Sequence, residues 1–247
     1  MFPGIGTLVN VVTVLIGSVI GVFAGHRLAE RTRDVVTDGL GLVTLLIAAL
    51  SATAITDSSL EAAVGDSAPV LIVLGALVIG GVIGSILGIE ESLEKFGGWL
   101  QRRLGGRGGA TRERFIEGYV TASLVFCVGP LTILGALNDG LGNGPDQLFL
   151  KAALDGFASI AFAASLGWGV AASVVSIVAI QGSLTVLGVF LGDVLPDAQL
   201  AAVTATGGLM LIGVALRLLR IRPLPVGDLL PALLVAPILT ALVAAYR

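Results

Sequence analysis

Residues 149–192, FLKAALDGFASIAFAASLGWGVAASVVSIVAIQGSLTVLGVFLG, form one long apolar run. A helix crosses a bilayer with about 20 apolar residues, so an apolar run of this length cannot cross only once. Gly167-Trp168-Gly169 lies near its middle and is typical of a hairpin tip. The run therefore predicts two membrane-spanning helices, although the sequence alone leaves open that they form one broken span.

The rest of the chain has the same apolar character. Hydrophobic residues make up 55% of its 247 residues and charged residues only 13%, about half the charged fraction of a soluble domain. Too few polar groups remain to cover a water-facing surface, so lipid must be the solvent for much of it. We therefore predict an all-α, polytopic bundle of seven or eight spans, forming a single domain over residues 1–247. Eight stretches are long enough to span a bilayer: 4–25, 36–56, 69–89, 115–138, 149–167, 169–192, 199–218 and 225–245.

Basic residues predict the orientation of these spans. Of the 14 Lys and Arg residues, 12 fall on one side of an eight-helix arrangement, whereas the loops on the other side carry Asp and Glu. Cytoplasmic loops are enriched in Lys and Arg, so this side is predicted to be cytoplasmic and both termini to lie outside. The 12 residues are Arg27, Arg31, Arg33, Lys95, Arg102, Arg103, Arg107, Arg112, Arg114, Arg217, Arg220 and Arg222.

The connection 90–114 is the one long loop on the basic side. Charged residues alternate there with Leu93, Phe96, Trp99 and Leu100 at the spacing of one helix face. We expect an amphipathic helix lying on the cytoplasmic membrane surface, where its basic residues contact anionic lipid.

Two internal similarities stand out. Glycines spaced by four residues end the first and third spans, a spacing that predicts flat strips for helix packing and also permits a homo-oligomer. These are Gly17, Gly21, Gly25, Gly80, Gly84 and Gly88. In addition, LGVFLG (187–192) resembles IGVFAG (20–25), which relates spans 1 and 2 to spans 6 and 7. In the eight-span arrangement these pairs cross in opposite directions, which predicts an inverted repeat of the kind found in secondary transporters.

Polar residues within the spans are the candidate site. A polar group at membrane depth is costly, so it usually faces a partner or a water-filled cavity. Asp155 and Ser159 lie in span 5, Asn10 in span 1 and Gln181 near the centre of span 6. Span 4 is interrupted at Gly129-Pro130, because proline removes a backbone hydrogen bond. Thr132 and Asn138 follow that break.

These residues favour a transporter or channel for a small ion or solute. Asp155 would be the charged ligand, Asn10 and Asn138 would support it, and the break at Pro130 would open a cavity. A carboxylate with amide and hydroxyl oxygens suits a hard cation, a proton or a polar organic solute, so the role of a metal stays open. The alternative is that Asp155 and Asn10 only join helices, in a non-transporting scaffold or sensor that acts through residues 90–114.

Enzymatic functions find little support in the sequence. The single histidine, His26, and the single cysteine, Cys127, lie at different depths. No catalytic triad order, phosphate-binding loop or metal-ligand spacing is recognisable. We therefore expect no catalytic residue, no cofactor and no nucleic-acid partner.

Three separated motifs connect the chain to a known family. The segments YVTASLVFCVGPLTILGALNDG (119–140), LDGFASIAFAASLG (154–167) and GTLVN (6–10) resemble the YqgA/YdfK-like family (DUF554). The resemblance extends over essentially the whole chain. It implies a bacterial inner-membrane protein, but it implies no substrate and assigns no functional residue.

Overall fold

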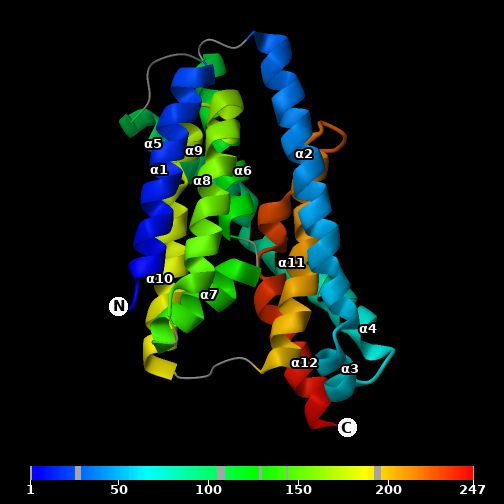
Figure 1. The fold of residues 1–247 in the computed structure, drawn as a ribbon. Helices are drawn as coiled ribbons and strands as arrows, with labels where there is room; N and C mark the ends of the chain where they lie inside the picture. The colour runs from blue at the N-terminus through cyan, green and yellow to red at the C-terminus, as the bar shows by residue number, and fades with distance from the viewer. Residues whose placement is uncertain are drawn as a thin grey trace. The chain divides into compact units, whose positions relative to one another are not determined.

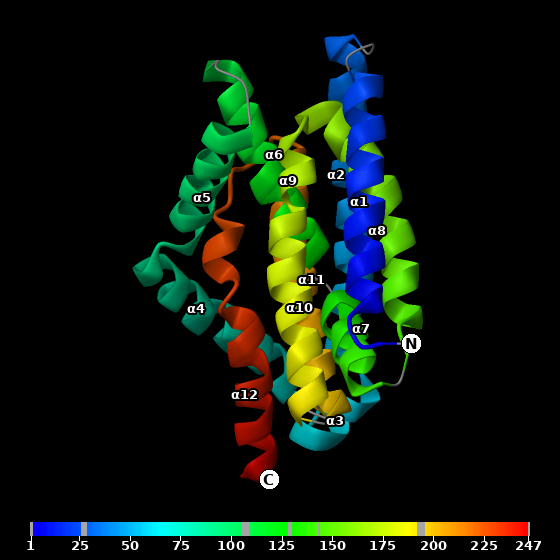
Figure 2. The same ribbon diagram turned by 90° about the vertical axis from the view of Figure 1, so that its left-hand side faces the viewer.

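The computed structural model describes residues 2–25, 29–104, 109–127, 130–142, 144–191 and 196–246, and all regular elements in these ranges are helical (Figure 1 and Figure 2). Contacts divide the chain into two compact units, Met1–Leu42 with Leu93–Val194 and Val43–Ser92 with Leu195–Arg247. The elements are α1 (Ile5–Gly25), α2 (Glu30–Ala52), η1 (Thr53–Thr56), α3 (Ser58–Val64), α4 (Ala68–Leu87), α5 (Ile89–Leu104), α6 (Gly109–Cys127), α7 (Pro130–Leu141), α8 (Asp146–Leu166), α9 (Gly169–Ala172), α10 (Val174–Leu191), α11 (Asp197–Leu218), η2 (Val226–Leu229) and α12 (Ala232–Ala245).

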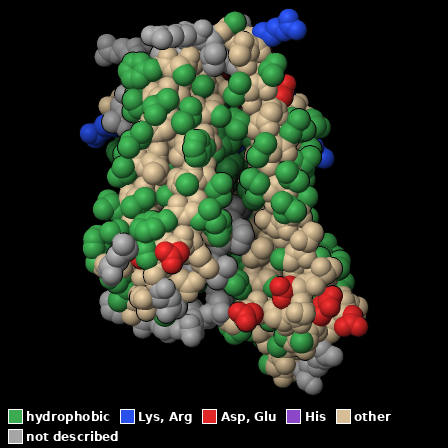
Figure 3. All heavy atoms as spheres, viewed as in Figure 1, with side chains coloured by type: hydrophobic (Ala, Val, Ile, Leu, Met, Phe, Trp, Pro, Cys, Tyr) green, Lys and Arg blue, Asp and Glu red, His purple; other side chains and the backbone are tan. Residues whose placement is uncertain are grey.

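The predicted transmembrane helix bundle is confirmed. Within the described residues, seven helices are long and apolar enough to span a membrane: Ile5–Gly25, Asp34–Thr56, Ala68–Leu87, Asp146–Leu166, Gly169–Val189, Asp197–Leu218 and Val226–Ala245. Large hydrophobic side chains lie exposed on these helices, among them Leu71, Ile86 and Phe157. Figure 3 shows hydrophobic side chains spread over the face that it draws. Lipid rather than water is the solvent that such surfaces require.

The long apolar run consists of two separate helices. The first span ends at Leu166 and is followed by Gly167 as its C-cap. The second span begins at Gly169. Gly167 has a φ of +79°, a backbone conformation that glycine adopts without strain. The predicted turn at Gly167-Trp168-Gly169 is therefore present.

In the first unit, α1 and α8 lie side by side and run in the same direction (Figure 1 and Figure 2). Successive glycines of α1 meet successive turns of α8: Gly17 lies against Gly156, Gly21 against Ile160 and Gly25 against Ala164. A Cβ atom on any of these three glycines would collide with a backbone carbonyl of α8. The four-residue glycine spacing thus lets the two backbones approach closely, as the sequence predicted.

Helices α6 and α7 form one bent crossing beside α8. They meet at an angle of 75°. Near the start of α6, Arg114 Nε donates to the carbonyl of Ser165 at the C-terminal end of α8, at 2.8 Å. Near the end of α7, Asn138 Nδ2 donates to Gln147 Oε1 at the opposite end of α8, at 3.1 Å. The pair therefore has contacts near both ends of α8, which is about 30 Å long. Counted as one broken span, it adds an eighth candidate crossing to the seven helices of the described residues.

The predicted helix break lies between α6 and α7. Gly129 is outside the described residues, whereas Pro130 is the first residue of α7. This first helical position suits proline, because the N–H that it lacks would have no partner there.

In the second unit, α4 packs against η2 and α12. Gly80 lies against Ala232 and Gly84 against Asp228, at distances that leave no room for a side chain. Gly88 does not continue this packing strip, which corrects the prediction: with a φ of +59° it ends α4 in the left-handed conformation typical of a helix C-cap. α11 lies beside α12, α3 and α4.

Helix α5 occupies the start of the predicted amphipathic connection. Leu100 is buried, whereas Phe96 and Trp99 are 39% and 44% exposed and stack with ring centroids 5.6 Å apart. Arg103 lies over the Trp99 ring at 5.4 Å. Residues 105–108 of the connection lie outside the described residues, and 109–114 begin α6. The cytoplasmic position of this helix stays a prediction, as do the inverted repeat and the single domain.

Candidate functional site

Three helices of the first unit bring polar side chains together at membrane depth. Asn10 of α1 donates from Nδ2 to Asp155 Oδ2 of α8 at 3.0 Å. The same nitrogen donates to Gln181 Oε1 of α10 at 3.3 Å. Asn10 and Gln181 are fully buried, and Asp155 is 8% exposed. The structure therefore joins three residues that the sequence had selected one by one.

Lys151 is a fourth member, which the sequence analysis missed. It lies one helical turn before Asp155 and forms an ion pair with its Oδ2 atom. Lys151 is only 5% exposed. Residues four apart lie on the same helix face, so a lysine in an apolar span four residues before an aspartate was the available signal. We call Asn10, Lys151, Asp155 and Gln181 the buried polar cluster.

The carboxyl group of Asp155 orients the cluster, because its Oδ2 atom is the shared partner of Asn10 Nδ2 and the Lys151 ammonium group. A carboxylate only accepts hydrogen bonds, so the Asn10 amide must present its nitrogen to Asp155. This orientation leaves Asn10 Oδ1 without a hydrogen-bond partner among the described residues. Gln181 in turn presents its oxygen to Asn10, and its Nε2 atom also lacks a partner there.

Two buried hydroxyl groups without hydrogen-bond partners in the described chain lie one helical turn from Asn10 and Gln181. Thr7 precedes Asn10 by three residues and Thr185 follows Gln181 by four, which places each on the same helix face as its neighbour. Within the described part of the chain, neither hydroxyl oxygen has a hydrogen-bond partner. The cluster thus continues into polar atoms that an ion, a solute or water could satisfy.

The cluster lies well inside the spans. With a rise of about 1.5 Å per residue, Asn10 lies about 8 Å along α1 and Asp155 about 14 Å along α8. Gln181 lies about 15 Å before the end of α10. Each of these side chains therefore lies at least about one and a half turns inside its helix, within the stretch that is apolar enough to span a membrane.

The other predicted ligands have different hydrogen-bond partners. Ser159 donates to the carbonyl of Gly156 at 2.8 Å and lies against Gly17. Thr132 donates to the carbonyl of Phe126 at 3.0 Å, across the break between α6 and α7. Asn138 donates to Gln147, as described above. None of these three hydrogen bonds is made to a residue of the buried polar cluster.

A second carboxylate anchors the start of α1. Asp139 of α7 is 3% exposed, and its Oδ2 accepts hydrogen bonds from the backbone N–H groups of Gly4 and Gly6, at 3.1 and 3.2 Å. The first N–H groups of a helix have no partner within the helix, and the helix dipole favours a negative charge there. Asp139 therefore holds α1 in place beside α7.

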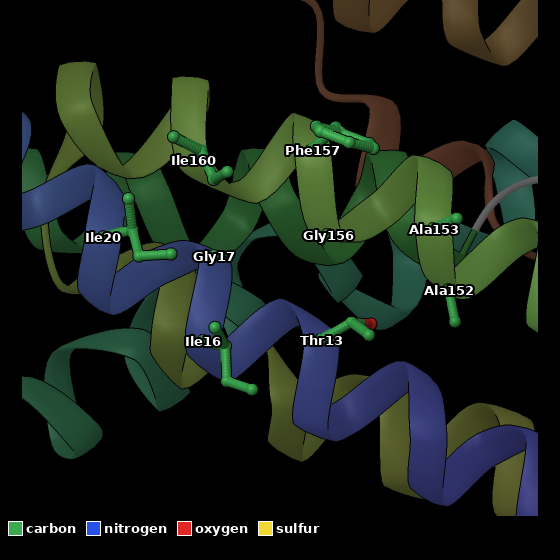
Figure 4. A pocket seen from close by; sticks show the side chains of 9 residues that line it. All are labelled: Thr13, Ile16, Gly17, Ile20, Ala152, Ala153, Gly156, Phe157 and Ile160. Atoms are coloured by element: carbon green, nitrogen blue, oxygen red, sulfur yellow. The ribbon is translucent and has the colours of Figure 1, made fainter.

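An apolar groove lies between α1 and α8, beside the buried polar cluster but not lined by any of its residues. It has a volume of about 230 Å³, with Ile16 and Ile20 on one wall and Phe157 and Ile160 on the other (Figure 4). Asp155 is not among its lining residues, although its neighbour Gly156 is. The groove thus offers a surface for hydrocarbon.

One carboxylate is the whole acidic content of the cluster. Among the described residues, no group of three or more His, Cys, Asp or Glu side chains is placed to hold a metal ion. Any cation in this cluster would bind through one carboxylate and neutral oxygens.

Comparisons with known proteins agree with the motifs found in the sequence. The family model described as "Protein of unknown function (DUF554)" matches residues 5–241. The uncharacterized protein YqgA of Escherichia coli (strain K12) is 31% identical over 238 residues, with 96% of each chain covered. The uncharacterized membrane protein YdfK of Bacillus subtilis (strain 168) is 27% identical over 241 residues, covering 98% of this chain and 97% of that protein. No solved structure matches.

Proposed function

Because the chain belongs to the DUF554 family, whose function is unknown, we propose a function from the geometry of the first unit: the protein is a transporter or channel for a small ion or solute, and the buried polar cluster is its binding site. One observation carries this proposal. Buried polar atoms of Asn10, Gln181, Thr7 and Thr185 lack hydrogen-bond partners among the described residues, beside the carboxylate of Asp155.

The energetic cost of these atoms supports a functional role. Each buried polar atom without a partner costs about 1–3 kcal/mol. Intramembrane ionisable residues are rare for the same reason, and they mark ion and substrate pathways. A packing role for Asn10 would need only the hydrogen bond to Asp155. It would not explain the additional unsatisfied atoms along α1 and α10.

The proposal requires a second conformation that opens the cluster. α1 and α8 are held together by backbone contacts at Gly17, Gly21 and Gly25, so we expect them to move as one body. The bent α6–α7 crossing is the more adaptable neighbour, since broken helices at membrane depth usually line a cavity.

A scaffold or sensor is the second candidate, supported by the surface of α5. Phe96 and Trp99 are both partly exposed, and Arg103 lies over Trp99. Aromatic and basic side chains on one helix favour an interface with a membrane surface. In that case Asp155 and Asn10 would serve only to join α8 to α1.

The arginine pattern supports further parts of the proposal. It favours a topology with the basic loops in the cytoplasm and both termini outside. Membership of the family favours a bacterial inner membrane. The partners are then the bilayer and a small ion or solute, and the activity is transport rather than catalysis.

Flux measurements on the purified protein in liposomes separate the two candidates. The panel contains protons, Li⁺, Na⁺, K⁺, chloride, phosphate and amino acids, with protein-free liposomes as the control. A transporter moves at least one of these solutes faster than the control, and Trp99→Ala leaves that flux unchanged. Flux equal to the control for the whole panel would favour the scaffold.

A further inference from the structure

We propose that Lys151 is an internal counter-ion for Asp155 and that the transported substrate is a monovalent cation that takes its place. This inference rests on the proposed function, because it names the substrate of the same cluster. It starts from the Lys151–Asp155 ion pair, in which the side chains are only 6% and 11% exposed.

Charge balance at this depth points to a single positive charge. An isolated carboxylate within the bilayer is strongly disfavoured, so in every conformation that excludes water Asp155 needs either a proton or a neighbouring cation. Lys151 supplies that charge in the present structure. A monovalent cation can replace the ammonium group without changing the net charge of the cluster. A divalent cation or an anion cannot.

The unsatisfied atoms fit the same substrate. Among the described residues, Asn10 Oδ1 and the hydroxyl oxygens of Thr7 and Thr185 have free lone pairs. Together with the carboxylate of Asp155, these oxygens can act as ligands of a cation. Hard cations prefer oxygen ligands, and divalent sites generally combine several carboxylates. One carboxylate with neutral oxygens therefore favours a monovalent ion such as Li⁺, Na⁺ or K⁺.

Lys151 also has a place to go when the cation binds. It precedes Asp155 by one turn and lies about 8 Å from the first residue of α8. A lysine side chain can extend its ammonium group along apolar surface toward water while its stem stays buried. The displaced ammonium can therefore reach the start of α8.

Cation binding to the full-length protein in detergent tests this inference. The probes are LiCl, NaCl and KCl, with N-methylglucamine chloride keeping the ionic strength constant, and the readout is the midpoint of thermal unfolding. We expect at least one cation to raise the wild-type midpoint saturably. Lys151→Met should lower the half-saturating concentration of that cation about tenfold, because the competing ammonium is gone. Lys151→Arg, which keeps a competing charge, should stay near the wild-type value.

If Lys151 only stabilised the site, Lys151→Met would raise the half-saturating cation concentration instead of lowering it. Unchanged or weaker cation binding by Lys151→Met would overturn the inference. If Lys151→Met does not fold in any of the three salts while Lys151→Met/Asp155→Asn does, the inference also fails, because the cation should have replaced the missing charge. The double variant should show no saturable cation effect.

The liposome assay keeps this result separate from the proposed function. Transport of a neutral or anionic solute by a protein whose midpoint no cation shifts would overturn the monovalent-cation inference and leave transport standing. Absence of both flux and cation binding would overturn both.

Discussion

The hydroxyl of Thr132, in the first turn of α7, donates a hydrogen bond to the carbonyl of Phe126, near the end of α6, at 3.0 Å. A helix break frees carbonyl groups that the next turn would otherwise satisfy, and an unsatisfied carbonyl is costly at membrane depth. Thr132 satisfies one of them across the bend. The bent crossing therefore has a specific polar contact that stabilises it.

Thr132→Val should destabilise the protein by about 1–3 kcal/mol, because it leaves the Phe126 carbonyl without this donor. Thermal unfolding in detergent measures the effect. Thr132→Ser keeps the hydroxyl and should retain most of the stability. Equal midpoints for the valine and serine variants would show that the hydrogen bond contributes nothing.

Asn10→Ala should abolish transport, whereas Asn138→Ala should leave most of it. Both residues were predicted as ligands. Asn10 donates to Asp155, whereas Asn138 donates to Gln147 at the start of α8. Flux of the identified substrate, normalised to the amount of folded protein in the liposomes, compares the two variants. Equal loss of flux in both variants would contradict the assignment of Asn10, and not Asn138, to the buried polar cluster.

Gly21→Ala should destabilise the protein by about 1–3 kcal/mol, as expected for overpacking. The added Cβ would lie 2.9 Å from Ala163 Cβ and would collide with the carbonyl of Ile160. Gly182→Ala is the matched control, since no atom lies within 4 Å of a Cβ at this position of α10. Thermal unfolding should show a lower midpoint for Gly21→Ala alone. A similar drop in both variants would rule out close packing as the cause.

Asp57 should stabilise α3 in a pH-dependent manner. It caps the helix, accepting from Ser59 N at 2.9 Å and from Ser59 Oγ at 2.6 Å, and these hydrogen bonds lower the pKa of Asp57 below its usual 3.8. A lowered pKa in the folded state means that the stabilisation is fully present above pH 3.8 and is lost as the pH falls through the lowered value.

Comparison of Asp57→Ala and Asp57→Asn measures this effect. The alanine variant should unfold at a lower temperature than wild type at neutral pH, and the difference should shrink in acid. Asparagine also caps helices but does not titrate, so Asp57→Asn should keep most of the capping at every pH. A difference between wild type and Asp57→Ala that does not change with pH would contradict the assignment.

The spans could be predicted from the sequence because crossing a bilayer depends on a local property, about 20 consecutive apolar residues. The stretch 199–218 was predicted and the helix is Asp197–Leu218. The four-residue glycine spacing likewise predicted the packing of Gly17 and Gly21, since it depends on one helix alone. At Gly88 the same spacing failed, because α4 ends there and the glycine caps it.

The composition of the cluster could be predicted only in part. Asn10 lies 145 positions from Asp155 and 171 from Gln181, and no local pattern encodes such contacts. The sequence grouped Asn138 and Thr132 with these residues only because all lie at a similar depth in their spans. In the structure, Thr132 donates to Phe126 and Asn138 donates to Gln147. Lys151 could have been predicted from its spacing, because residues four apart lie on the same helix face. A lysine four residues before an aspartate within an apolar run therefore indicates a buried ion pair.

Flux of the identified substrate through Asp155→Asn in liposomes tests whether the buried polar cluster is the transport site. The matched control is Asp146→Asn, which makes the same change at an exposed position of the same helix. We predict that Asp155→Asn inserts and folds but transports no faster than protein-free liposomes, whereas Asp146→Asn transports like wild type. Wild-type flux through folded Asp155→Asn would contradict the assignment of the buried polar cluster as the transport site.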